Sequence, residues 1–173
     1  SELFGYVAQR SAFGVDKKSG KRYFYVTFCQ TGNDNDPDRY TCDSASVISG
    51  KIFRYELDGF GRVKDNAKDI TPDMVNGVGL SGVDFCDGML VLSEIGEAHQ
   101  NSIYISLDNG ESWKQILYDL SVGKVNFTVP YMKPEYNSGI LLVHWMSDIK
   151  INPFNPDMAV FNTGTGVFVT RNL

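Results

Sequence analysis

The chain has 173 residues, of which 42% are hydrophobic and 13% aromatic, and its formal net charge is −5 at pH 7. This length is enough for one ordinary domain with a substantial core. The acidic balance argues against a nucleic-acid partner, because phosphate binding requires a concentrated basic face. No apolar run reaches membrane-spanning length, so we expect no membrane partner.

The pattern along the chain predicts short β-strands separated by turns, with hardly a helical period anywhere. Aromatic and β-branched residues dominate the apolar segments, and such side chains suit pleated surfaces. Gly, Asn, Asp and Pro fill the predicted turns, as in "DG", "DNG" and "NPFNPD". The expected strands, in chain order, span residues 3–8, 22–28, 51–57, 80–85, 88–94, 102–106, 112–117, 147–152, 158–163 and 166–170.

The strand pattern recurs in three units, at residues 1–76, 77–140 and 141–173. Four strands per unit are typical of a β-propeller blade, and the third unit lacks its last strand. Three blades are too few to close a ring. The sequence therefore predicts an all-β fold, an incomplete propeller of about three blades made of four antiparallel strands. We expect the remaining blades, or a second chain, to complete it.

The segment "SLDNGESW" fits the Asp-box pattern Ser/Thr-x-Asp-x-Gly-x-x-Trp at Ser106, Asp108, Gly110 and Trp113. A short carboxylate can accept hydrogen bonds from turn amides, and Gly permits the positive φ of a tight turn. We therefore expect these four residues to fasten a hairpin, with no catalytic role. A degenerate copy lies at residues 55–61, and a third begins at Thr170.

Cys29 and Cys42 flank a polar segment that a disulfide would close in an oxidising compartment. Cys86 lies on an apolar strand and is expected to be a buried thiol. The acidic residues of "NDNDPDRY" lack the glycine and the bidentate Glu of a calcium loop. The sequence predicts no metal site and no cofactor.

Several segments together resemble glycoside hydrolase family 74, which contains xyloglucan-specific endo-β-1,4-glucanases. They are "DITP", "GVGLSGVDF", "SIYISLDNGESW", "WMSDIKINPFNP" and "FNTGTGVF". The resemblance implies two seven-bladed propellers with the glucan in the cleft between them, and this chain is similar to later-middle blades of the first. It also implies a secreted protein with a polysaccharide substrate and two catalytic aspartates, neither recognisable here. We therefore predict no catalytic residue in the chain and expect it to be inactive alone.

The resemblance places Trp145 in the substrate cleft, where its ring would stack on a sugar. A core Trp on an inner strand is the alternative. His99 and Gln100 are candidates for polar sugar contacts, and Tyr131 could extend the stacking platform. Hydrolysis would need two carboxyl groups across the scissile bond. Asp84 and Asp148 are interpreted as structural, whereas Glu94 and Glu97 are placed on a loop bordering the cleft.

Two other classes of protein share the Asp-box. A sortilin-like propeller would bind a peptide or protein without catalysis. A sialidase would need three arginines converging on a carboxylate, and the arginines here are scattered. The "WMSDIKINPFNP" segment favours the glycosidase.

Overall fold

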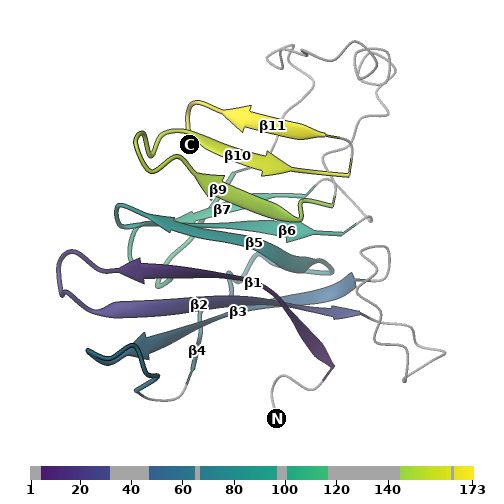
Figure 1. Cartoon of the computed structure of the whole chain (residues 1–173). Helices are drawn as coiled ribbons and strands as arrows, with labels where there is room; N and C mark the ends of the chain where they lie inside the picture. The colour runs from purple at the N-terminus through teal and green to yellow at the C-terminus, as the bar shows by residue number, and fades with distance from the viewer. Residues whose placement is uncertain (1–4, 32–46, 65–66, 97–100, 117–144, 165) are drawn as a thin grey trace, which may run out of the picture.

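The computed structural model describes residues 5–31, 47–64, 67–96, 101–116, 145–164 and 166–173, which form eleven strands and no helix. The strands make three antiparallel sheets in which consecutive strands pair (Figure 1). Sheet 1 contains β1 (Tyr6–Val15), β2 (Arg22–Thr31), β3 (Val47–Leu57) and β4 (Lys68–Asp69). Sheet 2 contains β5 (Gly79–Cys86), β6 (Met89–Ile95), β7 (Ile103–Ser106) and β8 (Lys114–Ile116). Sheet 3 contains β9 (Asp148–Ile151), β10 (Ala159–Asn162) and β11 (Val167–Thr170).

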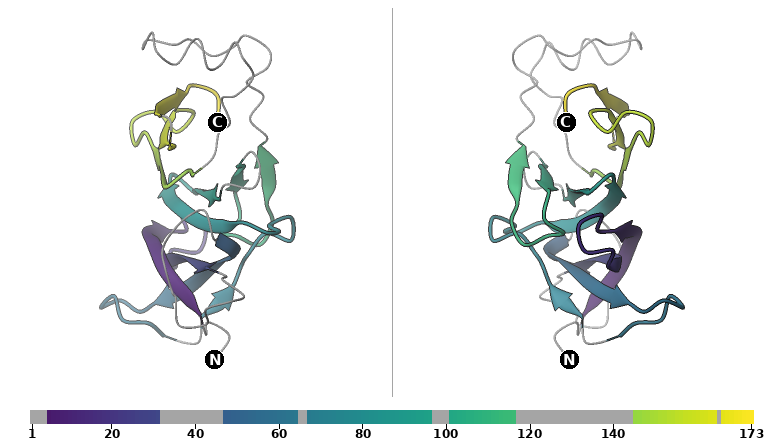
Figure 2. Two further views of the ribbon diagram at one scale, coloured as in Figure 1. Left: turned by 90° about the vertical axis from the view of Figure 1, so that its right-hand side faces the viewer. Right: turned by 90° about the vertical axis from the view of Figure 1, so that its left-hand side faces the viewer.

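The first strands of the three sheets lie side by side, with β5 between β1 and β9 (Figure 1). Turned views show the sheets following one another from the N-terminal to the C-terminal part of the chain (Figure 2). The all-β fold of successive propeller-like sheets is confirmed, and the described sheets do not close a ring. In the described part of the chain, no helix is long and apolar enough to cross a membrane.

Two hydrophobic cores hold the sheets together. Between sheets 1 and 2, Tyr25 and Ile52 pack with Leu80, Leu92 and Tyr104, all of them fully buried. Each such side chain contributes roughly 1.5–3 kcal/mol on burial. These five residues therefore supply much of the stability of this interface.

The second core, between sheets 2 and 3, includes Val91, Ile103, Ile149 and Phe161. Sheet 2 lies between the other two sheets, so both of its faces are covered. This explains why β6, "MLVLSEI", is buried along most of its length and lacks the alternation of a half-exposed strand.

The predicted strand positions agree with the structure except in sheet 1, where the two-residue strand β4 was not among the expected strands. β1 begins at Tyr6 and continues to Val15, beyond the predicted 3–8. The turn comes only at Asp16–Lys21, where the Asp16 amide donates to the Lys21 carbonyl at 2.8 Å. Gly14 is buried in the strand against the ring of Phe85. β3 likewise begins at Val47, before the expected residue 51.

The first strands of sheets 1 and 2 each contain a β-bulge opposite a hydroxyl of the neighbouring strand. In sheet 1 the Arg10 amide donates to Thr27 Oγ1 at 3.1 Å. In sheet 2 the Gly82 amide donates to Ser93 Oγ at 3.1 Å. Thr27 Oγ1 also donates to the Ser81 carbonyl of the next sheet at 2.5 Å. A bulge that faces a hydroxyl therefore shapes the first strand of sheets 1 and 2, and Thr27 also joins sheet 1 to sheet 2.

The sheets span residues 6–69, 79–116 and 148–170, inside the three predicted units. The boundaries of those units, at 76 and 140, stay predictions, since residues 117–144 lie outside the described part of the chain.

Candidate functional site

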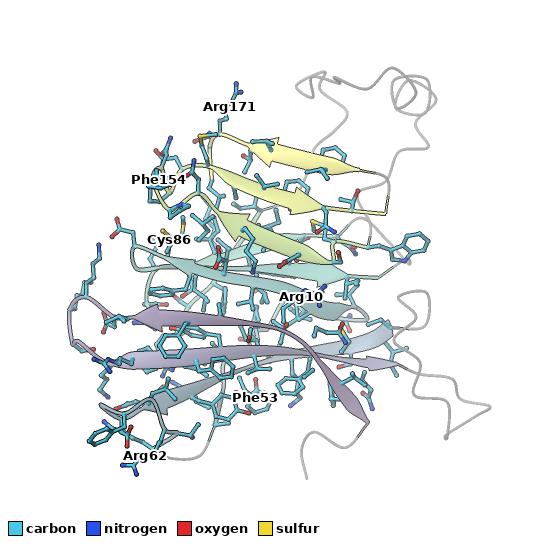
Figure 3. All side chains as sticks on the ribbon, in the orientation of Figure 1. Arg10, Phe53, Arg62, Cys86, Phe154 and Arg171 are labelled. Carbon is cyan, nitrogen blue, oxygen red and sulfur yellow. The ribbon has the colours of Figure 1, made fainter. Side chains whose placement is uncertain are left out.

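The two ends of the sheets differ in the connections that they carry. At one end are tight turns, including Asp87–Gly88 between β5 and β6, where both φ angles are positive (51° and 86°). Phe154 and Arg62 mark this end in Figure 3. At the opposite end the chain passes from β2 to β3 over residues 32–46, from β6 to β7 over 96–102 and from β8 to β9 over 117–147. We call this second end the loop end, and its longer connections make it the candidate binding face.

Trp145 lies at the loop end, immediately before sheet 3. It is partly buried, and its φ of 55° is unusual for a bulky residue. Its backbone amide donates to the Gly96 carbonyl at 3.2 Å, which ties the entry to sheet 3 to the end of β6. A Cβ atom at Gly164 would come within 2.4 Å of Trp145 Cε3, so the ring lies directly against the Gly164 backbone. The backbone of Trp145 is thus tied to the end of sheet 2, and its ring packs against the β10–β11 turn of sheet 3.

The other predicted binding residues, His99, Gln100 and Tyr131, lie outside the described residues. His99 and Gln100 follow closely after Gly96, the hydrogen-bond acceptor of the Trp145 amide. The connection that carries them therefore starts beside Trp145. Their contacts stay predictions.

A set of polar contacts fixes the chain that follows Trp145. Ser81 Oγ donates to the Ser147 carbonyl at 2.7 Å, and Asn162 Nδ2 donates to Ser147 Oγ at 2.5 Å. Arg10, a residue of β1 that is labelled in Figure 3, places its Nε 3.9 Å from Asp148 Oδ2. All three sheets thus contribute to the framework behind the loop end. Sequence reasoning missed Arg10, which lies in no motif, and Asn162, which lies within the "FNTGTGVF" segment but was not proposed as a site residue.

The carboxylates considered for catalysis are engaged in the fold. Asp84 Oδ2 accepts a 2.8 Å hydrogen bond from the Ile151 amide across the sheet 2–sheet 3 interface. Asp148 lies 3.3 Å from Lys150 Nζ, in addition to its contact with Arg10. Both arrangements match a structural role.

The family resemblance places Glu94 on a loop, and this is wrong. Glu94 lies within β6, where it is only 3% exposed. Its Oε2 accepts from the Ser102 amide at 2.7 Å, and its Oε1 accepts from the Tyr104 hydroxyl. Burial, followed by this contact with Glu94, raises the pKa of Tyr104 well above its ordinary value. The buried strand β6 can include Glu94 because Tyr104 and Ser102 donate hydrogen bonds to its carboxylate. Glu97 lies outside the described residues.

The turn between β7 and β8 contains Ser106, Asp108, Gly110 and Trp113. Asp108 Oδ1 accepts from Ser106 Oγ at 2.7 Å and from the Ser112 amide at 2.9 Å, and Oδ2 accepts from Ser112 Oγ at 2.5 Å. Partial desolvation raises the pKa of Asp108, but the hydrogen bonds from Ser112 and Ser106 outweigh it, so this pKa lies below its ordinary value. The oxygens of Asp108 are thus occupied by the turn, which leaves little capacity for catalysis.

The same turn contacts sheet 1. Trp113 Nε1 donates to the Ile70 carbonyl at 2.8 Å, and Arg54 Nη1 donates to the Asn109 carbonyl at 2.7 Å. Gly110 has a φ of 87°, and a Cβ there would lie 2.4 Å from Ile70 Cδ1. The glycine is therefore required both by the turn and by the adjoining sheet.

The degenerate copy of this turn, after β3, is fastened in a similar way. Asp58 Oδ1 accepts from the amides of Phe60 and Arg62 at 2.8 and 3.0 Å. After β11, the Asn172 amide donates to Thr170 Oγ1 at 3.3 Å, as the Asp108 amide does to Ser106 Oγ at 3.3 Å. The positions aligned by the sequence pattern thus make equivalent local contacts.

Cys29 is buried, and its Sγ lies 3.2 Å from the Leu80 carbonyl oxygen. Cys42 lies outside the described residues, so the predicted Cys29–Cys42 disulfide stays a prediction. Cys86 is partly buried beside the sheet 2–sheet 3 core. Within the described ranges no group of three His, Cys, Asp or Glu side chains could hold a metal ion.

Comparison with known proteins gives a likeness of fold. No protein-family model and no curated protein sequence matches the chain. The structure of the GH74 xyloglucanase from Xanthomonas campestris matches with a TM-score of 0.64 at 22% identity, over 98% of this chain and 21% of that one. The GH74 enzyme from Niastella koreensis matches with a TM-score of 0.62 at 16% identity, over 97% of this chain and 22% of that one. The chain thus spans about a fifth of either enzyme's length, and its fold is that of a β-propeller segment of GH74 glycoside hydrolases.

Proposed function

We propose that the chain is the glucan-binding part of a glycoside hydrolase, with xyloglucan as its substrate. The observation that carries the proposal is the position of Trp145. In a chain that matches GH74 enzymes over nearly its whole length, this ring lies at the loop end, where it packs against Gly164 while the Trp145 backbone amide is bonded to Gly96. An immobilised aromatic ring suits a sugar, because the C–H face of a pyranose can stack on it at little entropic cost.

Catalysis is assigned to carboxyl groups outside the described residues. Glycoside hydrolysis needs two carboxyl groups on opposite sides of the scissile bond. Asp84 and Asp148 are engaged between sheets, and Glu94 is buried. We therefore infer that further propeller blades, from the same polypeptide or a second one, supply the catalytic pair. We also infer that the whole protein is secreted, as suits an enzyme acting on a polymeric glycan.

Three further assignments complete the proposal. His99, Gln100 and Tyr131 contribute additional sugar contacts at the loop end. Ser106, Asp108, Gly110 and Trp113 form a structural Asp-box. A disulfide joins Cys29 to Cys42.

Affinity electrophoresis tests the proposed function. The chain should migrate more slowly in a native gel containing xyloglucan than in a gel containing the α-linked glucan dextran. Trp145→Ala should abolish most of this retardation. Phe154→Ala, which changes an aromatic residue 94% exposed on the opposite end, is the matched control and should have no effect. Equal migration of the wild-type chain in both gels would refute the proposed function.

A further inference from the structure

A concave surface lies where the outer strands of sheets 1 and 2 meet, and Trp145 is not part of its lining. It is a groove of about 370 Å³ between residues 68–74, which begin with β4, and residues 110–113 of the β7–β8 turn. This volume is at the lower end of the range for small-ligand sites. We call it the outer groove.

The walls of the outer groove are fixed by contacts between the two sheets. Trp113 Nε1 is bonded to the Ile70 carbonyl, and Glu111 pairs with Arg54 at 3.0 Å and with Lys68 at 2.6 Å. On the other wall, the Val75 amide donates to the Pro72 carbonyl at 3.0 Å. These contacts fix the shape of the groove, so a ligand would not have to order it.

The lining combines apolar surface with hydrogen-bonding groups. Trp113 packs partly on the core between sheets 1 and 2, and its remaining surface lines the groove together with Pro72 and Met74, which is 43% exposed. Asp73 is exposed and makes no hydrogen bond or ion pair with any residue that the structure describes. It is thus available to accept hydrogen bonds from a ligand.

The charges around the groove balance. Three carboxylates, on Asp69, Asp73 and Glu111, line the groove with the cation of Lys68. Two further cations, on Lys51 and Arg54, lie behind the lining, where they pair with Asp69 and Glu111. A strongly charged ligand therefore gains little net attraction here. A neutral ligand with one apolar face and several hydroxyl groups fits better, because the Asp73 carboxylate can accept O–H groups while Trp113 and Met74 cover C–H groups.

We propose that the outer groove is a second binding site for a neutral β-linked glucan, separate from the loop end. The choice of a glucan rests on the proposed function, whereas the neutral polyhydroxyl character follows from the groove itself. Such a site would hold a polymeric substrate on the outside of the propeller while another part of it occupies the loop end, which raises the effective concentration there.

The two tryptophans of the chain allow both sites to be observed in one experiment. In ¹⁵N-labelled full chain, each indole gives one NMR signal, and Trp145→Phe assigns them. On titration with cellohexaose, a neutral β-1,4-glucan oligosaccharide, the Trp113 signal should shift and saturate. Asp73→Ala and Met74→Ala should each weaken the binding reported by Trp113 about fivefold. Asp157→Ala, an exposed acidic residue on the β9–β10 turn, is the control and should change neither signal's titration.

Each outcome of this titration has one meaning. A shift of Trp145 alone, or a Trp113 response unaffected by Asp73→Ala and Met74→Ala, would overturn the outer groove and leave the proposed function standing. Movement of neither signal would overturn both. If a lysine-rich peptide, but not cellohexaose, shifts Trp113, the groove is a site for cationic peptides and the glucan assignment is wrong.

Discussion

Asp108 is a carboxylate of the type that can act in catalysis, but its oxygens are used in hydrogen bonds that stabilise the turn. Its carboxylate accepts three hydrogen bonds within its own turn, from Ser106 and Ser112. Asp108→Ala should therefore lower the free energy of unfolding by about 1 kcal/mol, allowing for solvent exposure of the turn. Urea unfolding measures this value. Asp157→Ala removes an exposed carboxylate with no bond to the described residues and should have almost no effect.

The contribution of Asp108 should also depend on pH. Its folded-state pKa lies below the ordinary value of 3.8. The stabilisation is therefore fully present above pH 3.8 and is lost as the pH falls through the lower, folded-state pKa. The difference in urea midpoint between wild type and Asp108→Ala should be constant from pH 7 to pH 5 and shrink below pH 3.8. A difference that grows on acidification would contradict this assignment.

At the scale of elements, the bulge hydroxyls specify how sheets 1 and 2 join. Thr27 is fully buried, accepts from the Arg10 amide and donates to the Ser81 carbonyl. Thr27→Val would leave both backbone groups without a partner and should cost about 1–3 kcal/mol. Thr27→Ser keeps the hydroxyl and should recover most of the loss. Chemical denaturation of the two variants distinguishes this role from simple packing, for which Val would be tolerated better than Ser.

Strand positions were largely predictable because turn residues and apolar runs are local signals. The turn after β7 was recognisable from Asp108 and Gly110 for the same reason. The extension of β1 to Val15 was not, since Gly14 packs against Phe85 of another sheet, a contact that the local sequence does not show. Burial of Glu94 was likewise hidden, because its partners Ser102 and Tyr104 come from the next strand.

At the scale of the molecule, the fold could be predicted because the pattern of short apolar strands recurs in three successive units of the sequence. The β-bulges were not predicted. Their sequence signal is a polar residue within an otherwise apolar strand, namely Thr27 and Ser93, both of which are buried. The outer groove could not be predicted, because residues 68–74 and 110–113 meet only when sheets 1 and 2 pack. The framework behind Trp145 likewise draws Arg10 from a distant part of the chain.

Sheets 1 and 3 also each present an apolar outer face. Phe13 on β1 is 56% exposed, and Val167 and Val169 on β11 are 71% and 56% exposed. Sheet 2, by contrast, has both faces covered by its neighbours. This difference supports the proposal that further blades flank the chain in the whole protein.

The central claim, that the loop end binds glucan through Trp145, is tested most directly by isothermal titration calorimetry with a xyloglucan oligosaccharide. Trp145→Ala should reduce the affinity about tenfold or more, because it removes the stacking surface. Trp113→Phe should leave tight binding at the loop end intact. Equal affinity of the wild-type chain and Trp145→Ala for the oligosaccharide would contradict the account.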